Sequence, residues 1–235
     1  MTPPHGPATD GGLDGPRRGP AAGGTATSLV ILLHGVGADG ADLISLADAW
    51  GPALPHTAFV SPNGPEPCDM APFGYQWFSL MDRSPESLAA GVTAAAPKVD
   101  AFIDREMASL GLTSAQTALV GFSQGCMMAL HVAPRRAEPL ACVLGYSGAL
   151  LGAEDLERDV RSRPPLFLVH GEVDEVVAVD ATRWAAQGLS AAGFEVEARI
   201  ERGLGHGIGP YGLRAGAGFL AKYLIPDDQP PVTVE

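Results

Sequence analysis

Apolar and polar positions follow one another in blocks that divide the chain into strands and helices. Six short apolar runs are typical of β-strands, at residues 29–33, 58–60, 117–120, 141–144, 166–169 and 194–200. The first five are almost wholly apolar, as expected for central strands of a parallel sheet that is covered on both faces. The last run alternates more, so we expect it at an edge of the sheet.

Stretches with helical spacing lie between these runs, at residues 42–49, 85–110, 124–133, 180–192 and 211–224. Ser84 is placed to cap the second of them, with Pro85 in its first turn, and Gly111 and Gly193 are placed to end helices. Pro97 should kink or divide the longest stretch because it has no N–H to donate. Strict alternation of strand and helix predicts a three-layer α/β/α sandwich, with its active site at the carboxyl ends of the strands.

The two ends of the chain differ from its middle. Residues 1–26 are rich in Gly and Pro and residues 226–235 carry three prolines, so composition predicts a flexible tail at each end. The remaining segment, 27–225, has the length of one domain, and its apolar content fits a folded globular protein.

Charge and cysteine content narrow the classes of partner and location. The 27 Asp and Glu against 15 Lys and Arg give a formal charge of -12, which would repel nucleic acid and anionic lipid. The start lacks the pattern of a secretory signal and no apolar run could span a bilayer, so we expect a cytoplasmic location. The cysteines share no metal-ligand spacing, so we expect reduced, structural thiols and no metal site; they are Cys68, Cys126 and Cys142.

The strongest chemical signal is Gly-Phe-Ser-Gln-Gly at 121–125, between a predicted strand and a predicted helix. In that context the pattern is typical of a nucleophile elbow, which exposes the hydroxyl of Ser123 on a tight turn. The flanking glycines leave room for the turn, and the helix N-terminus points N–H groups toward a developing oxyanion. The alternative is a serine that only caps a glycine-flanked helix.

A serine nucleophile needs a histidine base and an acid that orients it. His206 lies in a glycine-rich loop after the last predicted strand, whereas His34 and His170 end other strands and are more simply structural. Asp174 follows the strand at 166–169, and the order serine, aspartate, histidine is the one expected of α/β-hydrolases. We favour Asp174 over Glu172 and Glu175 as a short, buried acid, with Glu172 as the fallback; the other histidines, less well placed, are His5, His56 and His131.

The second half of an oxyanion hole is expected in the glycine-rich loop at 33–40. There the N–H of Val36 would pair with the N–H of Gln124. A glycine-rich turn after a strand also suggests phosphate binding, but no lysine follows it, so the P-loop interpretation fails.

Four segments together resemble the phospholipase/carboxylesterase family, which includes bacterial carboxylesterases and acyl-protein thioesterases: 34–40, 121–125, 170–177 and 205–206. The resemblance spans nearly the whole chain and implies an α/β-hydrolase fold, a mostly parallel sheet with helices on both faces and no large cap domain. It implies a catalytic domain at 27–225 with Ser123, Asp174 and His206 as its triad, and Val36 and Gln124 as oxyanion donors. It also implies no cofactor, and many members form dimers, so a homodimer is one expected assembly.

The resemblance changes the interpretation of two further segments. Residues 13–24 look like the family's N-terminal hairpin region, so the start of the chain is expected to be partly ordered. Trp77 and Phe78 are similar to the family's Trp-Phe stretch beside the acyl groove, whereas composition alone describes them as core aromatics. Ala178 stands where many relatives carry proline, which affects loop stiffness more than chemistry.

Three functions remain open at this stage. A carboxylesterase for short- to medium-chain esters is favoured, because residues 150–163 are too few to build a large cap over the groove. A thioesterase or lysophospholipase would need a longer apolar channel, and a non-catalytic binding module would not need the triad. In each case the partner would be a small ester or thioester, with no nucleic acid and no stable membrane insertion.

Overall fold

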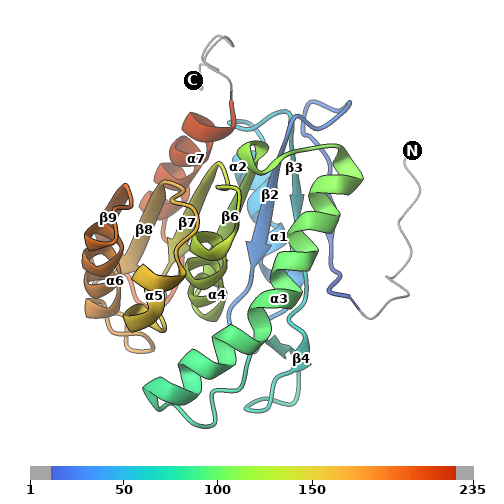
Figure 1. The fold of residues 1–235 in the computed structure, drawn as a ribbon. Helices are drawn as coiled ribbons and strands as arrows, with labels where there is room; N and C mark the ends of the chain where they lie inside the picture. The colour runs from blue at the N-terminus through green and yellow to red at the C-terminus, as the bar shows by residue number, and fades with distance from the viewer. Residues whose placement is uncertain (1–11, 226–235) are drawn as a thin grey trace.

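The computed structural model describes residues 12–225, which form a twisted central sheet between two layers of helices (Figure 1). Its seven strands lie in the order β1-β3-β2-β6-β7-β8-β9, and all pairs are parallel except β1 with β3. The strands are β1 Arg17–Arg18, β2 Ser28–Leu33, β3 Thr57–Val60, β6 Thr117–Phe122, β7 Cys142–Tyr146, β8 Leu166–Gly171 and β9 Val196–Glu201. All six predicted strands are present, and β9 lies at an edge as its alternating pattern indicated.

Four of the five predicted helical stretches are single helices in the described residues, and the fifth, 42–49, is two short helices instead of one. The helices are α1 Gly40–Ile44, α2 Leu46–Trp50, α3 Pro85–Leu110, α4 Gln124–Val132, α5 Ala153–Asp159, α6 Asp180–Ala191 and α7 Pro210–Leu224. Two elements were not expected from the sequence: α5, and a small hairpin of β4 Glu66–Pro67 with β5 Tyr75–Gln76. The α5 segment is short, so no large cap covers the sheet.

Alternate residues of β2 show why the sheet needs helices on both faces. Leu29 and Ile31 pack in an apolar cluster with residues of α3, α4 and α6. Val30 and Leu32 point the other way, into a second cluster with residues of α1, α2 and α7. Because neighbouring side chains of a strand leave on opposite faces, an almost wholly apolar strand is stable only between two covered faces.

The long helix α3 continues through Pro97, although sequence analysis expected a kink or a break there. Its buried residues lie on both sides of the proline, among them Val92, Val99 and Phe102. Packing of these residues in one cluster holds both halves against the sheet, which offsets the missing backbone hydrogen bond. The predicted ends are confirmed: the Ser84 side chain accepts the N–H of Ser87, and Gly111 ends the helix at φ 67°.

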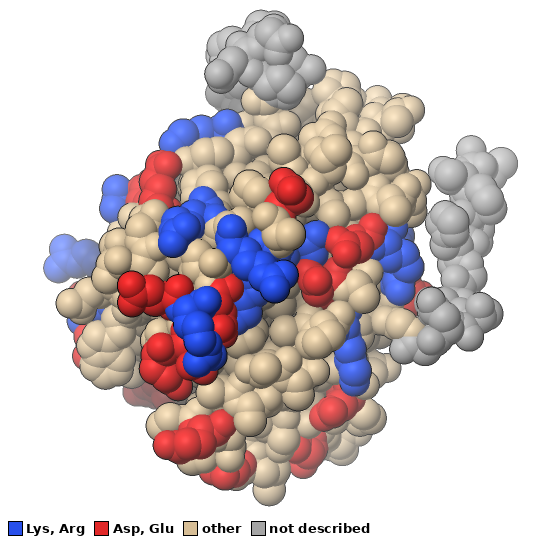
Figure 2. Space-filling model, in the orientation of Figure 1, with Lys and Arg blue, Asp and Glu red and all other residues tan. Residues whose placement is uncertain are grey.

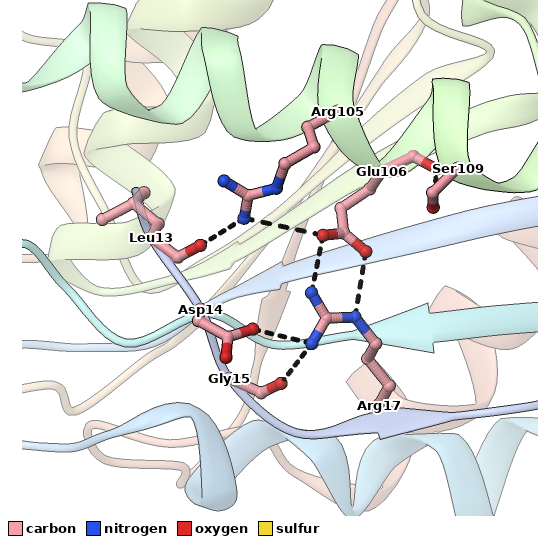
Figure 3. A network of polar contacts seen from close by, with 7 residues as sticks. All are labelled: Leu13, Asp14, Gly15, Arg17, Arg105, Glu106 and Ser109. Atoms are coloured by element: carbon pink, nitrogen blue, oxygen red, sulfur yellow. Dashed lines mark hydrogen bonds and ion pairs between the residues drawn. The ribbon is translucent and has the colours of Figure 1, made fainter. Parts of the chain in front are cut away.

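Residues 12–26 are fixed to the domain, contrary to the flexible tail that composition alone predicted. Arg17 of β1 reaches Glu106 of α3 with two guanidinium hydrogen bonds, 3.0 and 2.6 Å long (Figure 3). Arg17 also pairs with Asp14, and Arg105 donates to the carbonyl oxygen of Leu13. Arg17 and, at 3.7 Å, Arg105 together neutralise the buried carboxylate of Glu106. Residues 1–11 of the predicted N-terminal tail and the whole predicted C-terminal tail, 226–235, lie outside the described residues.

Charged side chains of both signs are mixed on the face that α3, α5 and α6 cover (Figure 2). Arg158, for example, pairs with Asp155 and Asp159 on α5. Such pairing leaves no continuous basic area on this face of the kind that a phosphate backbone would need. Among residues 12–225, no helix combines the length and the apolarity that crossing a bilayer requires.

Candidate active site

Ser123 occupies a sharp turn between β6 and α4, at the carboxyl edge of the sheet. Its φ angle is +55°, a conformation that non-glycine residues rarely adopt and that is found at strained functional turns. A Cβ at Gly121 would overlap the carbonyl group of Gly125, and a Cβ at Gly125 would overlap the carbonyl oxygen of Leu33. The steric reason given for the two glycines of the motif is therefore confirmed.

Gly125→Ala should lower kcat/KM for a nitrophenyl ester by about 10²-fold or more, the effect of displacing one oxyanion donor. The new methyl group would push α4 away from the end of β2, and the serine and the first N–H groups of α4 would move with it. Gly218→Ala is the matched control, because a Cβ on this helical glycine of α7 meets nothing within 4 Å. Steady-state kinetics on both variants, with circular dichroism to check folding, measure the difference; equal activities would contradict the steric argument.

Ser123, His206 and Asp174 are joined by two hydrogen bonds although they come from three separate loops. The Oγ of Ser123 lies 3.0 Å from Nε2 of His206, and Nδ1 of His206 lies 2.7 Å from Oδ2 of Asp174. A carboxylate can only accept, so Nδ1 carries the proton and Nε2 is left with a lone pair toward the serine. The arrangement allows the imidazole to take the proton of the serine hydroxyl.

The carboxylate of Asp174 is buried and fully engaged. Its Oδ1 accepts the backbone N–H groups of Val176 and Val177, at 2.8 and 2.9 Å. Burial by itself would raise the pKa of Asp174, but the hydrogen bonds from His206 and from these two amides outweigh burial, and the pKa lies below its usual 3.8. Asp174 is therefore negatively charged at neutral pH.

The rival acids lie elsewhere on the same loop. Glu172 is exposed, and its carboxylate accepts the N–H of Gly203 at 3.1 Å, which braces the loop of His206. Glu175 is also exposed, and the described residues show no hydrogen bond from its side chain. The geometry therefore favours Asp174 as the acid.

Two further residues place the histidine loop, and sequence analysis missed both. Gly171 lets the loop pass directly over the end of β8, since a Cβ there would overlap the carbonyl oxygens of Leu204 and Gly205. Glu201 accepts the N–H of Gly212 at 2.9 Å, which ties the end of β9 to the first turn of α7. Glu201 ends the strand that precedes the histidine loop, and this position in the sequence could have indicated that it supports the loop.

The expected oxyanion donors lie beside the serine. Gln124 is the first residue of α4, where N–H groups have no partner within the helix. Across the site, the Cβ position of Gly35 is 3.3 Å from the Cβ of Ser123, so the turn that carries Val36 adjoins the nucleophile. No hydrogen bond within residues 12–225 engages the N–H of Val36.

Buried polar contacts hold that turn in place. His34 accepts the N–H of Gly64 on Nε2 at 2.9 Å, so its Nδ1 donates to the carbonyl oxygen of Gly35 at 2.7 Å. Burial lowers the pKa of His34, which keeps the ring neutral. The N–H of Gly37 donates to the carbonyl oxygen of Tyr75 at 2.8 Å, which joins the turn to β5. His34 is thus structural, as the sequence indicated, and supports the expected oxyanion hole.

Trp77 and Phe78 lie beneath the site with their side chains in the core, 1% and 4% exposed. The side-chain amide of Gln124 accepts the N–H of Trp77 at 2.9 Å and donates to the carbonyl oxygen of Phe78 at 2.7 Å. The Trp77 indole N–H donates to the carbonyl oxygen of His34. The two aromatics therefore connect the elbow to the oxyanion turn, and their contact with a substrate stays a prediction.

In the described residues, the remaining titratable candidates make no hydrogen bond to Ser123 or His206. His131 is buried in α4, where burial lowers its pKa to about 4, and His56 is exposed. His170 is buried at the end of β8 and contacts Asp174, a contact that sequence analysis did not foresee. The three cysteines are buried free thiols. The described residues gather no group of three or more His, Cys, Asp or Glu side chains that could hold a metal ion.

A mostly parallel sheet with helices on both faces and a serine elbow at its carboxyl edge defines the α/β-hydrolase class. Residues 21–224 match the model of the phospholipase/carboxylesterase family. The esterase YpfH of Escherichia coli is 30% identical over 203 residues, which cover 86% of this chain and 84% of that protein. Acyl-protein thioesterase 1 of Aspergillus fumigatus is 28% identical, over 86% of this chain and 90% of that protein.

A comparison with a solved structure supports the same family. The crystal structure of esterase PE8 superimposes with a TM-score of 0.87 and 42% identity, over 91% of this chain and all of that one. The chain therefore belongs to the phospholipase/carboxylesterase family and is a hydrolase of the esterase and thioesterase type. The predicted fold and family are both confirmed.

Proposed function

We propose that the protein is a serine carboxylesterase that hydrolyses short- to medium-chain esters through an acyl-enzyme, with Ser123, Asp174 and His206 as its triad. The observation that carries this proposal is the unbroken path of hydrogen bonds from the serine Oγ through both nitrogens of His206 to Asp174. Each group on that path has the role its chemistry allows: a nucleophile, a base and an acid that orients the base.

In the acylation step, Ser123 Oγ attacks the carbonyl carbon of the ester while Nε2 of His206 takes the hydroxyl proton. The tetrahedral intermediate collapses as the same nitrogen returns the proton to the leaving alkoxide, which departs as the alcohol. Water then attacks the acyl-serine by the same route and releases the carboxylic acid. The negative charge of Asp174 stabilises the imidazolium at each stage, because its carboxylate stays ionised.

The developing oxyanion would be stabilised by the backbone N–H groups of Val36 and Gln124. Both are backbone donors on rigid segments, so they need no reorganisation as charge develops on the substrate oxygen. The side chain of Gln124 adds to this rigidity, since both ends of its amide are engaged by the segment of Trp77 and Phe78.

We favour esters of short to medium chain length because the site is open. The helix α5 is too short to form a cap over it. The second candidate, a thioesterase or lysophospholipase, is favoured by three exposed apolar residues on the segment around β5. Met70, Phe73 and Met81 are 43%, 74% and 72% exposed, and such residues could contact a long acyl chain. The family also suggests a cytoplasmic enzyme, with a homodimer as an assembly that light scattering would detect.

A series of p-nitrophenyl esters from acetate to palmitate, run beside a palmitoyl thioester and a lysophospholipid, tests the proposal. We expect the highest kcat/KM on the short esters. A maximum on palmitoyl substrates would move the function to the second candidate, and no hydrolysis of any of them would contradict an esterase role.

A further inference from the structure

His170 is a buried, polar group that the proposed mechanism leaves unused. It lies near the end of β8, and none of its side chain is exposed. Its Nδ1 is 2.7 Å from the hydroxyl of Thr182 on α6. Its Nε2 is 2.9 Å from the carbonyl oxygen of Val177 and 3.1 Å from Oδ2 of Asp174.

These neighbours determine where the protons of His170 lie. A carbonyl oxygen only accepts, so Nε2 carries a hydrogen and donates it to Val177, and the same N–H group also lies close to Asp174. In the neutral ring, Nδ1 then has a lone pair that accepts the hydroxyl hydrogen of Thr182. The ring is thus held at both nitrogens, with its N–H beside the acid of the proposed triad.

Oδ2 of Asp174 consequently has an imidazole on two sides. His206 donates to it from 2.7 Å and His170 faces it from 3.1 Å, while Oδ1 is occupied by two backbone amides. Rotation of the carboxylate about its Cβ–Cγ bond would break contacts on both oxygens. The His170 N–H on the far side of Oδ2 places a positive dipole 3.1 Å from this oxygen, and this attraction restricts the angle at which the oxygen faces His206.

We propose that His170 is a positioning residue that holds the Asp174 carboxylate at the angle required by His206, and so acts on proton transfer through Asp174. The inference rests on the proposed function, because it concerns the same triad. Within the described residues, His170 makes no hydrogen bond to Ser123 or to the expected oxyanion donors. Its removal should therefore lower kcat and leave KM unchanged.

Three variants measured with p-nitrophenyl acetate test this role. His170→Leu removes both ring nitrogens and should lower kcat about tenfold, which corresponds to about 1.4 kcal/mol of transition-state stabilisation, with KM within about twofold of the wild-type value. His170→Gln places an amide N–H near the position of Nε2 and should recover most of the loss. In an Asp174→Asn background, His170→Leu should cause no further loss, since the group through which it acts is already gone.

A merely structural histidine would give a different pattern. A folded His170→Leu protein with wild-type kcat would overturn the proposal. So would a His170→Leu substitution that lowers kcat by the same factor in the wild-type protein and in the Asp174→Asn protein. If circular dichroism shows that His170→Leu does not fold, Thr182→Val takes its place. We expect Thr182→Val to lower kcat about threefold with an unchanged KM. An unchanged kcat in this variant would overturn the proposal. An inactive wild-type protein would contradict the proposed function itself, so the two failures are distinguishable.

Discussion

Ser123→Ala should lower kcat for p-nitrophenyl acetate by about 10⁶-fold, the loss found when a serine protease loses its nucleophile. No other hydroxyl on the described residues contacts His206, so nothing remains to form the acyl-enzyme. A fluorophosphonate probe should add once to the wild-type protein and not at all to the variant, as measured by intact mass. The expected loss is large because His206 and Asp174 act only through the serine proton.

Ser147→Ala is the matched control for this experiment. Ser147 also ends a strand at the carboxyl edge of the sheet and also has a positive φ, +48°. Its hydroxyl is buried without a hydrogen-bond partner in the described residues, so no base activates it. We expect Ser147→Ala to be labelled once, at Ser123. An adduct on the Ser123→Ala protein would show that another residue is the nucleophile.

The nucleophile elbow could be predicted because its fold and its chemistry both depend on residues that are adjacent in the sequence. The apolar run before Ser123 must be a buried strand, and the two glycines permit one tight turn, so five adjacent residues determine both structure and role. The same holds for β9, whose alternating pattern already indicated one exposed face and an edge position.

Contacts between distant segments could not be predicted in this way. Arg17 and Glu106 are 89 residues apart, and nothing in either local pattern shows that a carboxylate on α3 and a guanidinium on β1 meet. The side chain of Gln124 is a similar case. Its backbone N–H was anticipated from the motif, but its amide binds a segment about 47 residues earlier in the chain.

Residue type also failed to distinguish a core aromatic from a substrate-binding one. Trp77 and Phe78 were assigned to an acyl groove by resemblance and to the core by composition. Their burial agrees with the core alternative, while their hydrogen bonds place them directly under the elbow and the oxyanion turn. Whether an aromatic side chain in a loop points into the core or toward the substrate groove depends on such contacts, and the sequence pattern does not show them.

Glu172→Gln should retain most of the wild-type activity, in contrast to substitution of Asp174. A glutamine keeps an oxygen that can accept the N–H of Gly203, so the brace on the histidine loop survives the loss of charge. This variant therefore serves as the control for the acid of the triad. A large loss in Glu172→Gln together with an active Asp174→Asn protein would transfer the role to Glu172.

Asp174→Asn should lower kcat by about 10⁴-fold with the fold intact. The amides of Val176 and Val177 both donate to Oδ1, so the carbonyl oxygen of an asparagine must occupy that site. Its NH₂ group then takes the place of Oδ2 and donates to Nδ1 of His206, which forces the ring proton onto Nε2. A protonated Nε2 cannot accept the proton of Ser123. Steady-state kinetics with p-nitrophenyl acetate measure this loss, and a variant within tenfold of wild-type activity would contradict the tautomer argument.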